Sequence, residues 1–215
     1  MSFNQYRTNP SQAVSKFKGR TDTPKAWPST AVSSWMNGGL FGGGAAAMVA
    51  LGKVVMDGTG VTVSFTSIPQ TYRHLRIVMA NGRRDSSGNA GFYLAFNSNT
   101  TVGDYGGWLQ MHAGPSITRA DHYWPPYGDI PSTTNSSAAV WDIADYANAS
   151  VGHSTQWQFA ADQFNSGYRG IGTTNWHPSS LAAITQIDVT SSNTSSGYYL
   201  EAPTTFTLFG IGTAA

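Results

Sequence analysis

From Lys53 onward, apolar and polar residues alternate along the chain with a period of two. This period is typical of β-strands that bury one face, because successive side chains of a strand point to opposite sides. Leu75, Ile77 and Met79 give an example, since they alternate with His74, Arg76 and Val78. The same pattern predicts further strands at 61–66, 92–96, 107–111, 138–142, 155–161, 168–173, 181–189, 198–201 and 205–211.

Turn signals separate these segments, among them Pro69, Asn81-Gly82 and Ser87-Gly88-Asn89. Regular strands and turns over about 160 residues, without a long helical pattern, predict an all-β fold of the antiparallel β-sandwich type, jelly-roll-like in its arrangement. A closed barrel is the alternative. Segment 114–137 is interpreted as a long loop.

The first 50 residues lack the alternation and are predicted to form an extended N-terminal arm (1–50) ahead of a β-sandwich domain (51–215). Glycines at 37–44 make a hinge, and 45–51 is either a short helical turn or an apolar strand. Free disordered tails are poor in aromatic residues. We therefore interpret several large side chains of the arm as anchors that dock on the body or on a neighbouring subunit: Phe17, Trp27, Trp35 and Phe41.

Charged residues make up only 11% of the chain, against about 25% in an average soluble domain. Glu201 is the single glutamate, whereas glycine occurs 24 times. A surface poor in charge suits a protein that touches other subunits, and it also suits an ordinary soluble β domain. The sequence contains no cysteine, so disulfides and thiolate metal sites are excluded.

The net charge of +1 hides an asymmetry, because residues 1–25 carry five basic side chains and one acid, Asp22. The arm is therefore basic and the rest of the chain mildly acidic. Five cations over such a length are too few to indicate nucleic-acid binding. We expect neither a signal peptide nor a membrane span, since the start is polar and the apolar stretch 45–51 is short.

Candidate chemistry is sparse along the chain. Asp142 and Asp145 are the nearest approach to a paired-carboxylate site, and we interpret them as solvated or turn-capping residues. The five histidines lack the spacing of a helical metal site. A Ser-His-Asp set stays open because its members can be far apart in sequence, but no Gly-x-Ser-x-Gly elbow occurs. We expect a non-enzymatic protein without cofactor or metal.

Aromatic residues in and beside the central loops give the one binding hypothesis. Sugars stack on aromatic rings, and loops at the rim of a sandwich often carry function. Packing between subunits is the alternative, because tyrosine and tryptophan are also enriched at interfaces. The candidate residues are Tyr105, Trp108, Tyr123, Trp124 and Tyr127.

Five segments occur in an order that resembles a domain recurrent in virion proteins of tailed bacteriophages, including those of cyanobacteria. They are SIPQTYRHLRI (67–77), FYLAFN (92–97), WDIADYA (141–147), ITQIDV (184–189) and FTLFGIG (206–212). The resemblance covers about residues 53–212 and omits the arm. It implies a β-sandwich used in tail fibres, necks, baseplates or capsid decoration, with no catalytic residues to transfer. It also implies that Tyr72, Leu75, Phe206 and Leu208 pack in the core.

These observations predict a virion structural protein, most simply a tail fibre, neck or baseplate component that assembles through its arm as a homotrimer. Its partners would be other virion proteins and itself. Capsid decoration (cement) is one alternative, and a module that binds host surface glycan is another. A glycan hydrolase is disfavoured by the near absence of glutamate.

Overall fold

The computed structural model describes residues 48–58, 60, 62–83, 90–113, 116–130, 137–161, 168–191, 200 and 202–213. The predicted arm, with its anchors Phe17, Trp27, Trp35 and Phe41, lies outside these residues. The described part contains no helix capable of spanning a bilayer.

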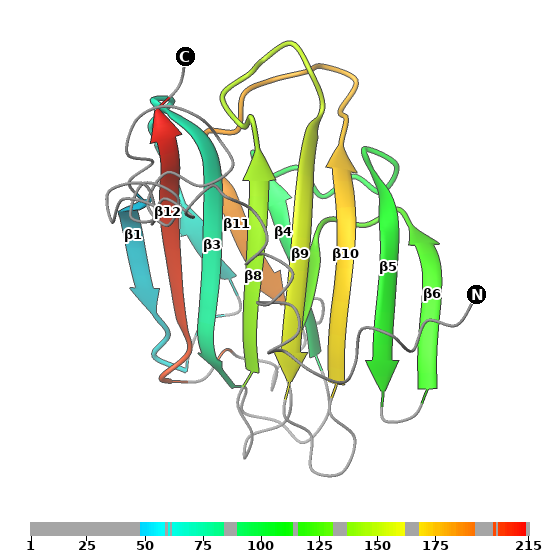
Figure 1. The fold of residues 1–215 in the computed structure, drawn as a ribbon. Coiled ribbons are helices and arrows are strands. Elements are labelled where there is room, and N and C mark those ends of the chain that lie inside the picture. The colour runs from blue at the N-terminus through cyan, green and yellow to red at the C-terminus, as the bar shows by residue number, and fades with distance from the viewer. Residues whose placement is uncertain are drawn as a thin grey trace, which may run out of the picture. The chain divides into compact units, whose positions relative to one another are not determined.

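Twelve strands form from the described residues, and every pairing between them is antiparallel (Figure 1). They are β1 (Met48–Val55), β2 (Thr62–Phe65), β3 (Tyr72–Gly82), β4 (Ala90–Phe96), β5 (Tyr105–Ala113), β6 (Ser116–His122), β7 (Tyr127–Ile130), β8 (Ser137–Ala144), β9 (His153–Ala161), β10 (Tyr168–Trp176), β11 (Ile187–Ser191) and β12 (Thr205–Thr213). The predicted all-β antiparallel sandwich is confirmed.

The strands make one sheet of eight, ordered β1-β12-β3-β8-β9-β10-β5-β6, and one of four, ordered β2-β11-β4-β7. The groups β1-β12-β3-β8 and β2-β11-β4-β7 have the strand order of the two halves of a jelly roll. Two additional hairpins, β5–β6 and β9–β10, are inserted along the chain between the strands of the jelly roll. Both join the larger sheet beyond β8, so this sheet is twice as wide as its partner (Figure 1).

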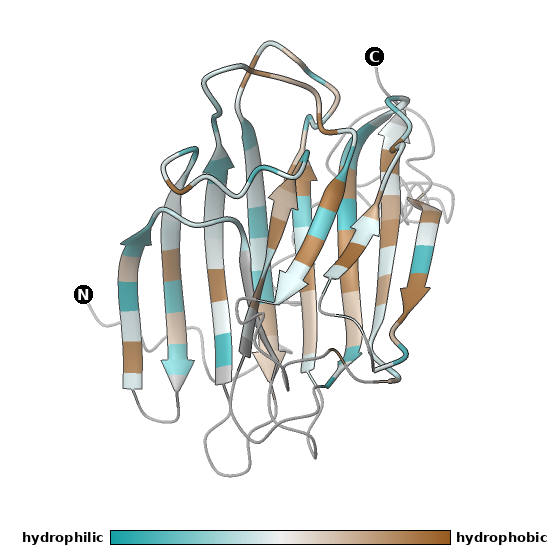
Figure 2. Ribbon diagram, turned by 180° about the vertical axis from the view of Figure 1, so that it is seen from behind, coloured by the Kyte–Doolittle hydropathy of each residue, from teal (hydrophilic) through white to brown (hydrophobic). Residues whose placement is uncertain are grey.

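The core lies between the sheets and follows the alternation of the strands, which Figure 2 shows as bands of apolar and polar residues. Trp141 of β8 is fully buried at its centre. The ring of Phe92 meets that of Trp141 edge-on at 5.3 Å and that of Phe206 at 6.2 Å. As expected, Phe206, Leu208 and Leu75 are buried, and Tyr72 packs against the core while half-buried.

Four of the five segments singled out from the sequence, at 67–77, 92–97, 141–147 and 184–189, are joined by hydrogen bonds between their ends. The hydroxyl of Tyr146 donates to the carbonyl of Pro69, and the backbone N–H of Ile184 donates to the carbonyl of Tyr146. The carboxamide oxygen of Asn97 accepts the backbone N–H groups of Thr185 and Gln186 at 2.9 and 3.1 Å. These segments therefore have a structural explanation that needs no ligand.

The prediction of one long loop at 114–137 is wrong, since β6 and β7 both lie within it. Six of the seven residues of β6 are exposed and only His122 is buried, so the strand lacks an apolar alternation. The strand predicted at 181–189 begins only at Ile187, because the buried Ile184 belongs to a loop. Residues 48–51, left as helix or strand, are part of β1, which starts ahead of the predicted boundary at 51.

Candidate binding surface

The outer face of the eight-stranded sheet, turned away from the smaller sheet, carries the polar partners of the core positions. Strand registers align these side chains in rows that cross the strands. The Trp108 row consists of Arg76, Asp142, Gln156, Thr173, Trp108 and Asp121. The Ile171 row beside it consists of Val78, Val140, Gln158, Ile171, Gln110 and Arg119.

Two hollows adjoin on this face, and together we call them the trough. One, of about 320 Å³, is lined by side chains of both rows, including Trp108 and Gln156. The other, of about 380 Å³, is lined by three residues of the Ile171 row and by the neighbouring Ala138, Ala160 and Arg169. Val140, Gln158 and Ile171 line both hollows. The two alanines leave room between larger neighbours, which explains the depression there.

Two glycines on β10 leave space for two aromatic rings that pack on the inner side of the sheet, behind the trough. A Cβ atom at Gly170 would lie 2.8 Å from Cζ of Phe159, and one at Gly172 would lie 2.6 Å from Cε2 of Trp157. The two rings stack on each other with centroids 6.2 Å apart. Because neither Gly170 nor Gly172 carries a side chain, the rings of Phe159 and Trp157 can pack over this part of β10.

The carboxylate in the trough is held by an ion pair. Arg76 donates from Nε to Oδ1 of Asp142 at 2.6 Å and from Nη2 to Oδ2 at 3.0 Å. This hydrogen bonding raises the pKa of the Arg76 guanidinium. Both side chains are about two-fifths exposed, so the pair adds little stability. Its effect is to fix the orientation of the carboxylate and to neutralise its charge.

The glutamine side chains of the two rows differ in whether they form hydrogen bonds with other described side chains. Gln110 accepts from Nε of Arg119 at 2.9 Å, and its own amide lies 2.7 Å from Nε2 of His112. By contrast, the exposed side chains of Gln156, Gln158 and Thr173 form no side-chain hydrogen bond with other described residues. These two amides and one hydroxyl are therefore available to a ligand.

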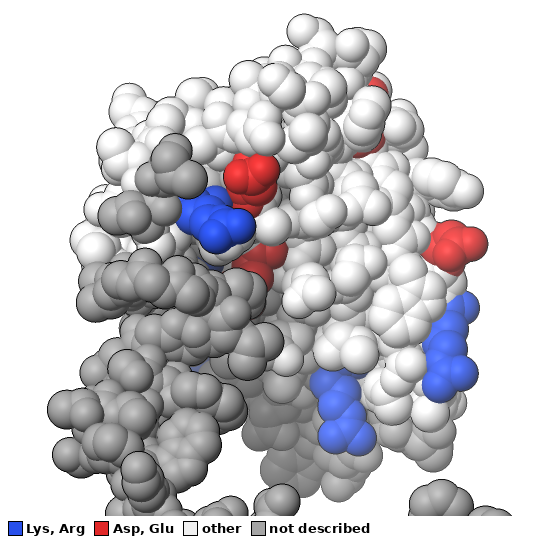
Figure 3. Space-filling model, turned by 45° about the horizontal axis from the view of Figure 1, so that its top comes forward, with Lys and Arg blue, Asp and Glu red and all other residues white. Residues whose placement is uncertain are grey.

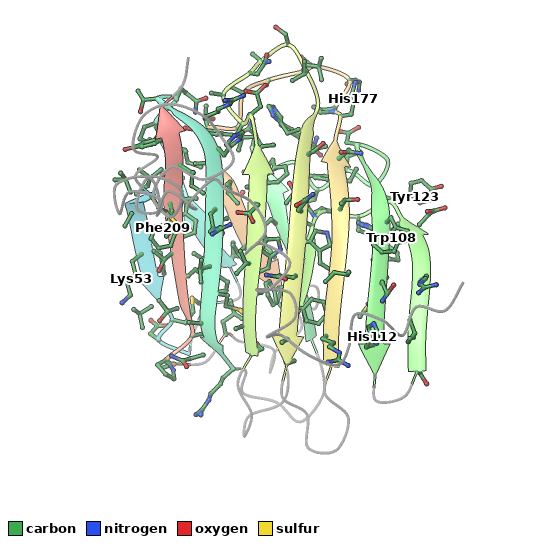
Figure 4. All side chains as sticks on the ribbon, in the orientation of Figure 1. Lys53, Trp108, His112, Tyr123, His177 and Phe209 are labelled. Carbon is green, nitrogen blue, oxygen red and sulfur yellow. The ribbon has the colours of Figure 1, made fainter. Side chains whose placement is uncertain are left out.

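The five aromatic residues singled out from the sequence do not form one site. Trp108 lies on strand β5 and is 38% exposed in the trough, whereas Tyr123 and Trp124 are exposed between β6 and β7 (Figure 4). Tyr127 opens β7, and its side chain is outside the described residues.

The interpretation of Tyr105 as a surface aromatic is wrong, because it is buried in the core. Its hydroxyl accepts the backbone N–H of Phe96 at 3.1 Å and donates to the carbonyl of Asn99 at 2.8 Å. Burial raises the pKa of this phenol, so Tyr105 stays neutral.

His122 lies on the inner side of the sheet, 2% exposed, between the rings of Trp124 and Trp157. Its Nε2 is 3.3 Å from the hydroxyl of Thr174. Burial lowers the pKa of His122, which favours the neutral imidazole in the folded protein.

We expect the free energy of unfolding to fall as the pH drops below about 6.5, the ordinary histidine value. Below this pH His122 takes up a proton in the unfolded chain, whereas burial keeps the ring neutral in the folded protein. The contribution of His122 to stability is therefore complete above pH 6.5 and is lost as the pH falls toward the lower pKa of the folded state. Urea unfolding at several pH values should show that the free energy of unfolding depends less on pH in His122→Gln than in the wild type. The exposed His177 gives a matched control, and equal slopes for His122→Gln and wild type would contradict the assignment.

No group of three or more His, Asp or Glu residues that could hold a metal occurs in the part of the chain that the structure describes. Asp142 is paired with Arg76, and Asp145 accepts a hydrogen bond from the amide of Asn148 at 3.1 Å. Comparison of the chain with family models, with curated proteins and with solved structures gives no match.

Proposed function

We propose that this chain is a structural subunit of a tailed-bacteriophage particle, in a tail fibre, neck or baseplate appendage, and that it assembles through its N-terminal arm. The observation that carries the proposal is the jelly-roll order of eight of its strands, an arrangement that also builds viral capsid domains. Fold alone does not give function. The ordered segments that resemble phage virion proteins add a second, independent reason.

The first strand supports assembly at the start of the body. β1 is an edge strand of the eight-stranded sheet, paired with β12 on one side. Met48, Val49 and Val55 are exposed on it to 51, 39 and 55%. An edge strand with exposed apolar side chains invites pairing with another chain. It also directly follows the arm in sequence.

The surface is consistent with extensive contacts between subunits. Figure 3 shows that charged side chains are few among the described residues of the visible face, most of which is uncharged. Cores of protein interfaces are depleted in charge in the same way. In the proposed particle, much of this surface would be covered by neighbouring copies and by other virion proteins.

Deleting residues 1–45 tests the proposal. The described strands begin only at Met48, and Ala46–Ala215 forms a compact unit, so the truncated chain should keep its far-UV circular dichroism and melting temperature. We expect the full chain to be a trimer by light scattering and the truncated chain to be a monomer that no longer enters particles.

Substitution of Trp27 and Trp35 by alanine in the full chain provides a matched control that keeps the length of the arm. This variant should also fail to assemble. Incorporation of the truncated chain at the wild-type level would overturn the role of the arm. Counting copies and their symmetry axis in a particle map would separate an appendage from capsid decoration.

A further inference from the structure

We infer that the trough on the outer face of the eight-stranded sheet is a binding site for an oligosaccharide, with Trp108 as its stacking platform. The inference does not depend on the position of the chain in a particle. It rests on the shape of the trough, on the chemistry of its side chains and on the distribution of charge around it.

The dimensions suit a short, extended ligand. The Trp108 row crosses four neighbouring strands between Trp108 of β5 and Asp142 of β8. With neighbouring strands about 4.8 Å apart, this distance is roughly 14 Å. The two adjoining hollows, of about 320 and 380 Å³, are open to the outside of the sheet. Several sugar rings can lie across the strands at this place.

The side chains match the two kinds of surface that a sugar presents. The ring of Trp108, together with Val140 and Ile171, offers apolar surface to the C–H faces of sugar rings. The free amides of Gln156 and Gln158 each carry both donors and acceptors. A hydroxyl group of a sugar also donates and accepts, so these amides can pair with it in either direction.

The ion pair supplies the third element. Both oxygens of Asp142 receive hydrogen bonds from Arg76, which holds the carboxylate in one orientation at the end of the row. Each oxygen can accept a further hydrogen bond from a sugar hydroxyl. A small number of fixed polar groups beside apolar surface is the general composition of small-molecule sites.

Charge disfavours the arm of this protein as the occupant. Residues 1–25 carry five cations and one acid. The carboxylate lining the trough is already paired with Arg76, and Arg169 adds a positive charge at the other end. A basic peptide would therefore meet net positive charge, whereas an oligosaccharide would not be repelled.

The test uses the full chain on a printed array of neutral and acidic oligosaccharides, followed by calorimetric titration with the best-bound glycan. Trp108→Ala should weaken binding at least about tenfold, the effect expected from the loss of one aromatic contact. Trp108→Phe should restore part of the affinity. Gln156→Ala and Gln158→Ala should each weaken binding several-fold.

Trp124→Ala is the matched control. Trp124 is 57% exposed but stacks on His122, on the opposite side of the sheet from Trp108. This variant should bind within twofold of the wild type, and circular dichroism and thermal unfolding should show that each variant is folded.

The inference is overturned if no array member is bound, if Trp108→Ala binds as tightly as the wild type, or if Trp124→Ala loses as much affinity as Trp108→Ala. Binding of a peptide of residues 1–45 to the truncated body, abolished by Trp108→Ala, would overturn it in favour of the arm.

Discussion

Replacing Gly107 with alanine should lower the free energy of unfolding by about 2–3 kcal/mol, toward the upper end of the roughly 1–3 kcal/mol that overpacking costs. Gly107 of β5 pairs with Thr174 of β10, and the backbones come very close. A Cβ atom at Gly107 would collide with the carbonyl oxygen of Thr173 and would lie 2.9 Å from Cα of Thr174. Backbone atoms within a sheet cannot move aside as a flexible side chain can.

The adjacent residue provides the control. An added Cβ at Gly106 meets nothing within 4 Å, so Gly106→Ala should change the stability by no more than about 0.5 kcal/mol, as usual for surface substitutions. Urea unfolding of both variants measures the difference. Equal stabilities would show that β5 and β10 are not held at this separation. Because Trp108 follows Gly107 directly, Gly107→Ala should also shift the platform of the trough.

Trp141→Ala should be the most destabilising single change in the core, at about 3–5 kcal/mol. Trp141 is fully buried and lies between Ile77 and Trp157 in the register of the large sheet. It also touches the smaller sheet through Phe92. Its removal leaves a cavity where the two layers meet. With a total stability of about 5–15 kcal/mol for a typical domain, the variant should melt at a much lower temperature.

Trp141→Phe is the corresponding control. The indole N–H of Trp141 has no hydrogen-bond partner among the described residues, so phenylalanine gives up no hydrogen bond and keeps much of the apolar volume. Calorimetry of both variants should place Trp141→Phe well above Trp141→Ala in melting temperature. Similar melting temperatures for the two variants would mean that the site collapses around either side chain.

The strands that bury one regular face were predictable from the sequence. In β9, buried residues alternate with exposed ones from His153 to Ala161, so hydrophobicity marked nearly the whole strand. In β6 the same pattern is missing, because only His122 turns to a buried side. Local alternation shows which strands exist and which face each buries, but it carries no signal for a strand exposed on both faces.

The pairing of strands, and with it the trough, could not be predicted. Trp108 and Thr173 are neighbours in the sheet but lie far apart along the chain. The alternation predicts strands at 155–161 and 107–111, but it does not indicate that Gln156 and Trp108 would lie in the same row of the sheet. Tyr105 is predicted to be a loop aromatic because it precedes the central segment, whereas its hydroxyl forms two hydrogen bonds with backbone groups inside the core.

The two hairpin pairs that interrupt the jelly roll have a consequence for how this surface can change during evolution. Trp108, Gln156, Gln158, Ile171 and Thr173 all belong to β5, β9 or β10. None of them lies on the eight strands whose order defines the jelly roll. Substitutions or exchange of the added hairpins can therefore alter what the outer face recognises while the two-layer scaffold is conserved. We therefore expect related chains to diverge faster in these added strands than in the eight strands of the jelly roll.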